Sequence, residues 1–257
     1  MNELFLEIGE RAVREAGSIL IKRYGKEVSV KTKKDGTQVS KLDILSEQSI
    51  IRTLTESDMG FSIRGEETNA IHSGSDYTWI IDPLSNTKGY LQKNGDFAIS
   101  LALLDKTGVF LGFVFDPMHD DLYIAQRNSG SFLNKEKIQT VKKRQKNPSV
   151  FINRWCKESF PDMMKLTSDV TVLSDSIALA MCRNSTSNKP HTLVLYSDVF
   201  STAAASLFLK ETGCVCTDMQ GNELDFNGMS SKKEYGIICS ADKMFHAHIM
   251  KTITNFL

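Results

Sequence analysis

The first half of the chain carries four short apolar runs that have the composition of buried strands. They are rich in Ile, Leu, Val and Phe and are separated by short polar stretches. The runs cover residues 78–81, 97–104, 109–115 and 122–125. Runs of this length between turn residues are typical of β-strands, and the short turns after the second and third runs favour an antiparallel meander. The first half is therefore predicted to build a sheet.

Two helices are expected before this sheet. Between residues 4 and 24, apolar side chains recur at steps of three and four, which is the spacing of an amphipathic helix. Gly25 can end this helix because glycine tolerates a positive φ. A second helix is expected over residues 40–54, and the polar residues 33–36 between the helices predict a turn or mobile loop.

The second half alternates strand and helix patterns. Strand candidates lie at residues 150–153, 170–173, 192–196, 214–217 and 236–239, and helix candidates at 175–183, 202–212 and 243–256. This alternation is typical of α/β architecture. A Lys- and Asn-rich stretch over 135–148 marks a change of subdomain. We expect an N-terminal α+β half over 1–147, which holds the metal-binding strand end, and a C-terminal α/β half over 148–257, together forming one compact unit.

The charge and hydropathy patterns exclude several classes of partner. The chain has 31 basic and 31 acidic residues, so it has no long-range field that would attract a nucleic acid polymer. It has no apolar stretch of about 18 residues that could span a membrane, and no apolar signal-peptide core. We therefore expect a soluble cytoplasmic protein with neither a membrane nor a nucleic acid polymer as partner.

The cysteines and histidines do not predict a zinc site. Of the five cysteines, only Cys214 and Cys216 lie close together, in a C-x-C spacing. In a strand these two thiols would point to the same face, which favours buried small hydrophobes. His246 and His248 fall on the C-terminal helical pattern, where residues two apart do not share a face.

Candidate functional residues gather around the end of the first strand. The run 78–81 is followed by Asp82-Pro83, and the triplet Gly65-Glu66-Glu67 precedes it. Carboxylate oxygens are hard ligands that suit Mg²⁺, and a proline after the strand end fixes the carboxylate at the sheet edge. Each piece alone is typical of an ordinary turn, but their order along the chain suggests a metal site.

A wider pattern supports this interpretation. Residues 79–88, Trp-Ile-Ile-Asp-Pro-Leu-Ser-Asn-Thr-Lys, resemble the signature W-[IV]-[IV]-D-P-L-D-G-T-[KT] of the inositol monophosphatase family. Lys88 and the segments 94–102 and 218–221 resemble the 3'(2'),5'-bisphosphate nucleotidase branch of that family. The resemblance extends from the N-terminal helix to about Phe226. It implies a layered αβαβα sandwich, of α+β or α/β class, with the site between the two halves.

The resemblance also implies a magnesium site, and the chain departs from it. In the family pattern Glu66, Asp82 and the backbone carbonyl of Leu84 would hold a first Mg²⁺, and Asp82 would bridge to a second. The other ligands of the second ion are aspartates, where this chain has Ser85 and Ser201. A serine hydroxyl can ligate Mg²⁺, but it is neutral. Each carboxylate that is replaced removes on the order of several kcal/mol of electrostatic attraction to the ion. We expect one plausible Mg²⁺ site and a doubtful second site.

Three residues are implied to act in catalysis. Thr87 and Asp43 would orient and deprotonate a water, and Glu66 completes the catalytic set. Asn86 and Thr87 would contact the phosphate, at a helix start where the family has Gly-Thr. Because Asn tolerates unusual φ values, the turn can keep its shape while the Asn86 side chain narrows the phosphate pocket.

Three functions remain open on these residues. The first is a divergent phosphate-monoester hydrolase whose catalysis is strongly impaired or lost, since both missing acids fall on the same ion. The second is an active Mg²⁺-dependent phosphatase acting on 3'-phosphoadenosine 5'-phosphate or an inositol phosphate. The third is a non-catalytic module that binds a ligand or a protein, with the retained acids as remnants of a decayed site. The expected partner is a small phosphorylated metabolite, and the expected state is a monomer or a homodimer.

Overall fold

The protein is built from two sheets and the helices around them. The computed structural model describes residues 2–32, 38–138, 148–165, 167–174, 176–186, 191–231 and 233–254. Its helices are α1 Asn2–Arg23, α2 Lys41–Thr55, α3 Thr87–Leu91, α4 Arg154–Ser159, α5 Ile177–Thr186, α6 Val199–Glu211 and α7 Lys243–Thr254, with a 3-10 helix at Pro161–Lys165.

The first half forms a seven-stranded sheet whose strands lie in sequence order. Its strands are β3 Ser62–Gly65, β4 Thr78–Ser85, β5 Ala98–Asp105, β6 Gly108–Asp116, β7 Asp121–Gln126, β8 Gly130–Leu133 and β9 Glu136–Lys137. The β3–β4 pair is parallel and every later pair is antiparallel, which confirms the predicted meander. A separate pair, β1 Val30–Thr32 and β2 Gln38–Ser40, leads into α2.

The second half forms a mixed five-stranded sheet. Its strands are β10 Ser149–Asn153, β11 Val170–Leu173, β12 His191–Ser197, β13 Val215–Asp218 and β14 Tyr235–Ser240. The spatial order is β11-β10-β12-β14-β13, with β10 parallel to both its neighbours and β14 antiparallel to both of its own. The predicted strands and helices of this half are all present, within a few residues of their expected bounds.

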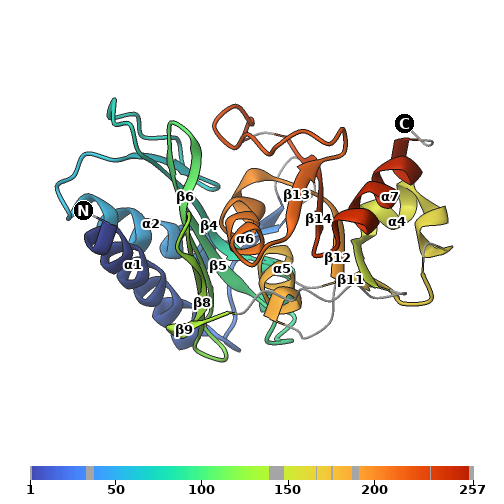
Figure 1. Ribbon diagram of the computed structural model, residues 1–257. Coiled ribbons are helices and arrows are strands. Elements are labelled where there is room, and N and C mark those ends of the chain that lie inside the picture. Colours follow the sequence, from blue (N-terminus) through green and yellow to red (C-terminus); the bar gives the residue numbers. More distant parts are fainter. Residues whose placement is uncertain are drawn as a thin grey trace.

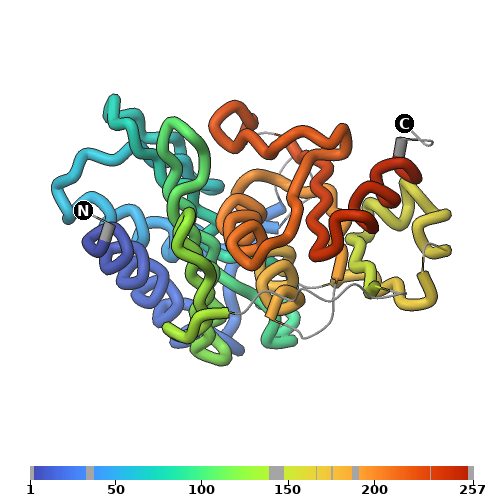
Figure 2. Tube along the Cα trace, viewed as in Figure 1, coloured from blue at the N-terminus to red at the C-terminus, as the bar shows by residue number. Residues whose placement is uncertain are grey.

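Helices and sheets alternate across the molecule, so that α1 and α7 lie at opposite ends (Figures 1 and 2). Helices α1 and α2 pack on the outer face of the seven-stranded sheet, α5 and α6 lie between the two sheets, and α4 and α7 lie beyond the five-stranded sheet. The central core draws on both sheets, from Ile80 and Tyr123 to Leu193 and Cys239. This layering confirms the predicted αβαβα sandwich. The boundary at residues 147 and 148 stays a prediction.

Strand β4 does not stop where the sequence suggested. The strand was expected to end before Asp82-Pro83, but it continues to Ser85. Asp82 pairs with Ser100 and Ser85 pairs with Ala98, so two residues of β4 face one residue of β5. Proline lacks an N–H, and such a bulge lets the strand pass through it. The expectation of a strand end before Asp82-Pro83 was therefore wrong, because the strand continues through a bulge to Ser85.

Several smaller expectations can also be compared with the structure. Gly25 has a φ of 79° and follows α1, as predicted. All five cysteines are free and buried, as expected for small hydrophobes. The turn predicted at residues 33–36 lies outside the described residues, and so does most of the stretch 135–148. No helix in the described part of the chain is long and apolar enough to cross a membrane.

The contact between β6 and α6 gives a prediction about stability. A Cβ on Gly112 would lie 2.7 Å from the backbone oxygen of Ala204 and 3.0 Å from its Cα. Backbone cannot move aside as a side chain can, so Gly112→Ala should lower the free energy of unfolding by about 1–3 kcal/mol. Urea unfolding followed by circular dichroism would measure this. An unchanged midpoint would contradict the close approach of the sheet and helix.

Candidate functional site

A cavity of about 550 Å³ lies at the end of β4, where the two halves meet. Its wall includes every site residue predicted from sequence except Asp43. The lining residues are Thr32, Gln38, Glu66, Asp82, Leu84, Ser85, Asn86, Thr87, Lys88, Asp198 and Ser201. Among the described residues, three carboxylates and one lysine, Lys88, therefore line one cavity.

Asp82 is the most buried of these acids, with 1% of its surface exposed. Its Oδ1 accepts a hydrogen bond from the backbone N–H of Leu84 at 3.2 Å, and its Oδ2 accepts one from the Ser201 hydroxyl at 3.0 Å. Burial, followed by the nearby charges of Glu66 and Asp198, raises the pKa of Asp82 well above its usual range. The two hydrogen bonds only partly offset these effects.

Ser201 and Asp198 are both placed by the start of α6. Asp198 is the N-cap residue, and its Oδ1 accepts from the backbone N–H of Ser201 at 2.9 Å. Asp is among the residues preferred at this position because its carboxylate satisfies a free helix N–H. The same capping turn directs the Ser201 hydroxyl to Asp82. A residue from α6 thus meets the end of β4 across the interface between the halves.

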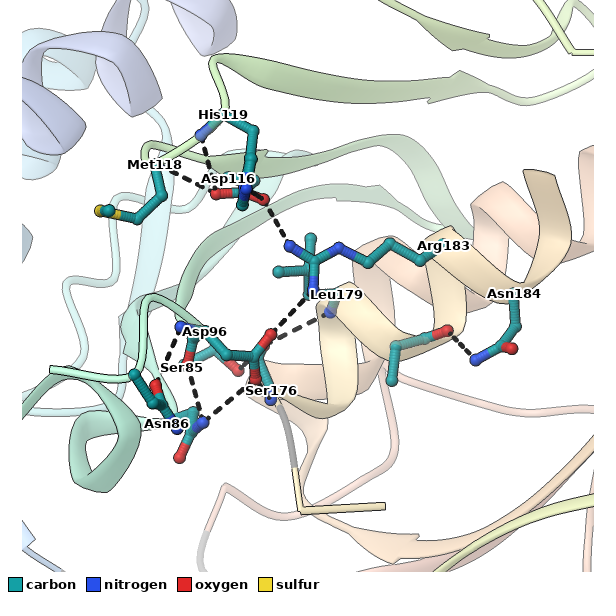
Figure 3. A network of polar contacts seen from close by, with 12 residues as sticks. Ser85, Asn86, Asp96, Asp116, Met118, His119, Ser176, Leu179, Arg183 and Asn184 are labelled. Carbon is teal, nitrogen blue, oxygen red and sulfur yellow. Dashed lines mark hydrogen bonds and ion pairs between the residues drawn. The ribbon is translucent and has the colours of Figure 1, made fainter. Parts of the chain in front are cut away.

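Ser85 is tied into a second polar network, which Figure 3 shows. The Ser176 hydroxyl donates to Ser85 Oγ at 2.8 Å, and the Ser176 backbone N–H donates to Asp96 Oδ2 at 2.8 Å. Ser85 is 4% exposed and Ser176 is 1% exposed. The position where the family has a second-metal aspartate is therefore engaged with another hydroxyl.

Arg183 links this network to β6. Its Nη1 donates to Asp96 Oδ1 at 2.8 Å and its Nη2 to Asp116 Oδ2 at 2.6 Å, as Figure 3 shows. Burial lowers the pKa of Arg183, but the hydrogen bond to Asp116 and the charges of Asp116 and Asp96 raise it by more, so the net shift of this pKa is upward. Asp116 is fully buried and also accepts from the backbone of Met118 and His119. A partly exposed cation thus joins α5 to two segments of the first half.

Asn86 adopts the backbone shape that the sequence suggested. Its φ is 69°, in the left-handed region, and it is the N-cap of α3. The side chain accepts from the Gly89 N–H at 3.0 Å and donates to the backbone oxygen of Asp96 at 2.7 Å. A Cβ on Gly89 would lie 2.3 Å from Asn86 Nδ2. Asn86 lines the cavity as expected, while its amide holds the turn together.

Thr87 and Asp43 come together although 44 residues separate them. The Thr87 hydroxyl donates to Asp43 Oδ1 at 2.7 Å and approaches the Leu84 carbonyl oxygen at 3.2 Å. The other oxygen of Asp43 accepts from the backbone and hydroxyl of Ser40, which completes a capping box at the start of α2. Asp43 is therefore a structural cap and a partner of Thr87 at once.

Glu66 follows β3 and reaches the cavity beside Asp82. Its backbone N–H donates to the Ile81 carbonyl at 3.2 Å, which fixes its place next to β4. The neighbouring Glu67 N–H donates to the buried Glu47 Oε2 at 3.0 Å. The structure thus places Glu66, Asp82 and Leu84 around one cavity, as the metal-site prediction requires.

The donor set around this cavity fits one hard cation better than two. Glu66, Asp82 and the Leu84 carbonyl offer oxygen atoms, which suit Mg²⁺. For a second ion, Ser85 and Ser201 offer only hydroxyls, and both hydroxyls already take part in hydrogen bonds. Within the described ranges, no group of three or more His, Cys, Asp or Glu side chains is arranged to hold a metal. At the positions that the family pattern gives to a second ion, the described residues therefore offer fewer carboxylates than at those of the first.

Some site residues were missed by sequence reasoning. Asp198 was detectable, because an Asp directly before an apolar helical run is a usual N-cap signal. Ser176 and Arg183 carried no such signal, and Asp96 lies in the segment 94–102, which the family resemblance singled out without giving Asp96 a role. Their contacts join segments that lie 80 to 91 residues apart, so only the folded chain brings them together.

The fold and the site can now be compared with known proteins. A model of the inositol monophosphatase family matches residues 1–256. The chain belongs to this family. Among curated relatives, Nus factor SuhB of Haemophilus influenzae is 29% identical over 230 residues, which cover 84% of this chain and 86% of that protein. Inositol-1-monophosphatase of Bacillus subtilis is 30% identical over 139 residues, covering 53% of this chain and 52% of that protein.

Solved structures agree with this assignment at the level of the fold. An IMPase from Thermotoga maritima has a TM-score of 0.84 and 23% identity, covering 100% of this chain and 98% of that chain. The extragenic suppressor protein suhB from Bartonella henselae has a TM-score of 0.85 and 22% identity, covering 97% of this chain and 98% of that chain. These identities are low, so the likeness concerns the fold alone. The link to the bisphosphate nucleotidase branch stays a prediction.

The raised pKa of Asp82 gives a prediction about pH. Because the folded state favours the protonated carboxyl, this contribution to stability is fully present below the ordinary value of 3.8 and is lost as the pH rises through the folded-state pKa. In EDTA at pH 7, Asp82→Asn should therefore raise the melting temperature. The gain should shrink as the pH is lowered toward 3.8. Calorimetric melting at several pH values would measure both effects.

The amide of the Asp82→Asn variant can keep both hydrogen bonds, since the Ser201 hydroxyl can accept as well as donate. The matched control is Asp76→Asn, whose side chain is 64% exposed and should show no comparable gain. A lower melting temperature for Asp82→Asn at pH 7 in EDTA would contradict the charge arrangement described for the cavity.

Proposed function

We propose that this protein is a divergent phosphate-monoester hydrolase of its family with strongly impaired or lost catalysis. One observation carries the proposal: the two serines at the second-cation positions form hydrogen bonds within the protein. Ser201 donates to Asp82 at 3.0 Å, and Ser85 accepts from Ser176 at 2.8 Å. Each hydroxyl thus replaces a metal–carboxylate contact with a direct contact between side chains. The expected ligand is a small phosphorylated metabolite.

One bound cation remains part of the proposal. Glu66, Asp82 and the Leu84 carbonyl would hold Mg²⁺, which when bound would activate a water and neutralise phosphate charge. Without a cation, a phosphate dianion would meet the charges of Glu66, Asp82 and Asp198 in one cavity. Two like unit charges about 4 Å apart repel by roughly 1–4 kcal/mol in water or near a protein surface. Phosphate binding in this cavity should therefore require the cation.

The Thr87–Asp43 pair supports some surviving chemistry. The Thr87 hydroxyl donates a hydrogen bond to Asp43 at 2.7 Å, so the lone pairs of the Thr87 oxygen remain available to accept a hydrogen bond from a water. Asp43 would accept the proton that the water releases through Thr87. In the decayed-site alternative these two residues would persist only as caps, and the capping box at Ser40 supports that alternative as well.

A non-catalytic binding module is the second candidate. The internal bonds of Ser85, Ser176 and Arg183 support it, because they connect the two halves without help from a metal. The relatives include proteins named inositol-1-monophosphatase and proteins named Nus factor, so their names favour neither candidate. An active phosphatase at ordinary rates is the third candidate, and the loss of both second-cation acids speaks against it.

Restoring the acids tests the proposal. The variant Ser85→Asp, Ser201→Asp, Asn86→Gly should gain several orders of magnitude in phosphate release over the unaltered protein, because leaving-group stabilisation returns. Release from adenosine 3',5'-bisphosphate and from inositol 1-phosphate should be assayed with Mg²⁺. The Asn86→Gly change should also cost about 1–2 kcal/mol of stability, since bonds to Gly89 and Asp96 are lost.

The double variant without Asn86→Gly is the matched control for that loss of stability. Ordinary turnover by the unaltered protein would overturn impaired catalysis. A folded triple variant that binds Mg²⁺ but shows no gain would also count against the proposal, because the defect would then lie elsewhere in the site.

A further inference from the structure

Two buried thiols face each other across the last two strands of the five-stranded sheet. Cys216 on β13 pairs with Cys239 on β14 in the antiparallel register, and β13 is the end strand (Figure 1). Both residues belong to the central core, and the Cys216 thiol donates to the Ser206 carbonyl oxygen of α6 at 4.0 Å. Cys216 is 4% exposed and Cys239 is fully buried. The fold therefore brings two of the five cysteines together on one face of the sheet.

The backbone hydrogen bonds show which kind of pair these cysteines form. The Asp218 N–H donates into the turn after β13 at 2.9 Å, away from β14. Backbone groups of residues two apart point the same way in a strand, so those of Cys216 also point away from β14. On the other strand, the Ala241 N–H donates to β12 at 3.0 Å, so the backbone of Cys239 also points to β12. Cys216 and Cys239 are therefore a non-hydrogen-bonded pair.

This kind of pair has the geometry that a disulfide requires. Opposed residues of a non-hydrogen-bonded pair have Cα atoms about 4.5 Å apart, closer than in a hydrogen-bonded pair. Disulfides usually join Cα atoms about 4.4–6.8 Å apart, so a bond between Cys216 and Cys239 needs little backbone movement. Burial and, after it, the interaction with the Cys239 thiol raise the pKa of Cys216 well above its usual range. The two thiols therefore already interact in the folded protein.

A third cysteine in this region is placed differently. Cys214 lies two residues before Cys216 on the same chain segment and belongs to the same core cluster. Continued by one residue, the β13–β14 register places Ala241 opposite Cys214, and Ala241 has no thiol. The Cys214 thiol instead lies 3.8 Å from the Thr212 hydroxyl. Cys214 is therefore similar to Cys216 in burial but is not opposed by a cysteine.

We propose that Cys216 and Cys239 form a disulfide when a small-molecule disulfide oxidises the protein. One cysteine thiolate attacks the small disulfide, breaks its S–S bond and releases a first small thiol. The other cysteine thiolate then attacks the mixed disulfide, which forms the Cys216–Cys239 bond and releases a second small thiol. The two cysteine protons pass to the released thiols, and the small disulfide gains the two electrons that the protein loses. This site needs no cation, so it does not rest on the proposed hydrolytic function.

The reaction should proceed through local opening of the sheet edge. Burial disfavours the reactive thiolate of Cys216, so the closed sheet protects it. Opening of the end strand β13 would separate it from α6 and expose the thiols of Cys216 and Cys239 together. Oxidation is therefore expected to take minutes to hours, which is usual for uncatalysed disulfide exchange.

The new bond would secure a segment that connects the two halves. The chain after β13 reaches the first half, where Arg64 on β3 donates to the carbonyl oxygens of Phe226 at 3.1 Å and Met229 at 2.8 Å. A disulfide between β13 and β14 would fix the start of this segment to the sheet. The oxidised protein should therefore be more stable than the reduced protein.

Peptide mapping and thermal melting test the proposal on the unaltered protein. After incubation with oxidised glutathione, mass spectrometry of an unreduced digest should find one crosslinked peptide pair that joins Cys216 to Cys239. The melting temperature should rise by about 5 °C or more, because the bond restricts the unfolded chain. Dithiothreitol should reverse both changes.

Variants identify the responsible thiols. Cys216→Ala and Cys239→Ala should each abolish the crosslink and the rise in melting temperature. The matched control is Cys214→Ala, which removes a buried thiol from the same segment and should leave both unchanged. The peptide mapping needs no variant, so its result holds even where a variant does not fold.

Four results would overturn the proposal. These are no crosslinked peptide in the oxidised protein, a crosslink that contains Cys214, an unchanged melting temperature of the crosslinked protein, and a rise that persists in Cys239→Ala. All measurements are made in EDTA without a phosphorylated ligand. A failure of the proposed metal site would therefore leave the expected results unchanged, and the two proposals can fail separately.

Discussion

The Asp82 carboxylate is buried where the two halves of the chain meet, and the rest of the site depends on how its charge is balanced. A buried carboxylate needs hydrogen bonds, a proton or a cation. Here the backbone N–H of Leu84 and the hydroxyl of Ser201 meet its two oxygens, and two further acids act against its ionisation. We propose that this balance lets the chain keep the family fold without a second cation at Asp82.

Direct bonds between side chains connect the two halves around the cavity. Ser201 reaches Asp82 from α6, Ser176 reaches Ser85 from the segment before α5, and Arg183 reaches two acids of the first half. A guanidinium is permanently charged and offers a fixed fork of donors, so it can join two carboxylates in one geometry. Bonds within the protein therefore hold the site in shape, and under the proposed function a cation is needed only for ligand binding.

Much of the fold could be predicted from the sequence. The four apolar runs predicted the meander, and the repeated apolar spacing predicted α1. The left-handed backbone of Asn86 was expected because Asn tolerates unusual φ values. The predicted strand end at Asp82 was wrong because a bulge lets β4 continue past Pro83. Local sequence propensity does not show whether such a bulge forms.

The site residues that belong to a sequence motif could be predicted. The contacts between residues that are distant in the sequence could not. Ser201 and Asp82 are 119 residues apart, so nothing in either local sequence indicates that they share a hydrogen bond. The substitution of acids by serines was visible in the sequence, but the partners that those hydroxyls find were not. For Asp198, the local sequence indicates the role of helix N-cap, but it does not indicate that the residue lies near Asp82.

A crystal structure grown with Mn²⁺ in place of Mg²⁺ tests the central claim most directly, because anomalous scattering counts the ions in the cavity. We predict one ordered ion, bound by Glu66, Asp82 and the Leu84 carbonyl, with Ser85 still bonded to Ser176. Two well-ordered neighbouring ions, one of them ligated by Ser85 or Ser201, would contradict the claim that hydrogen bonds have replaced the second cation.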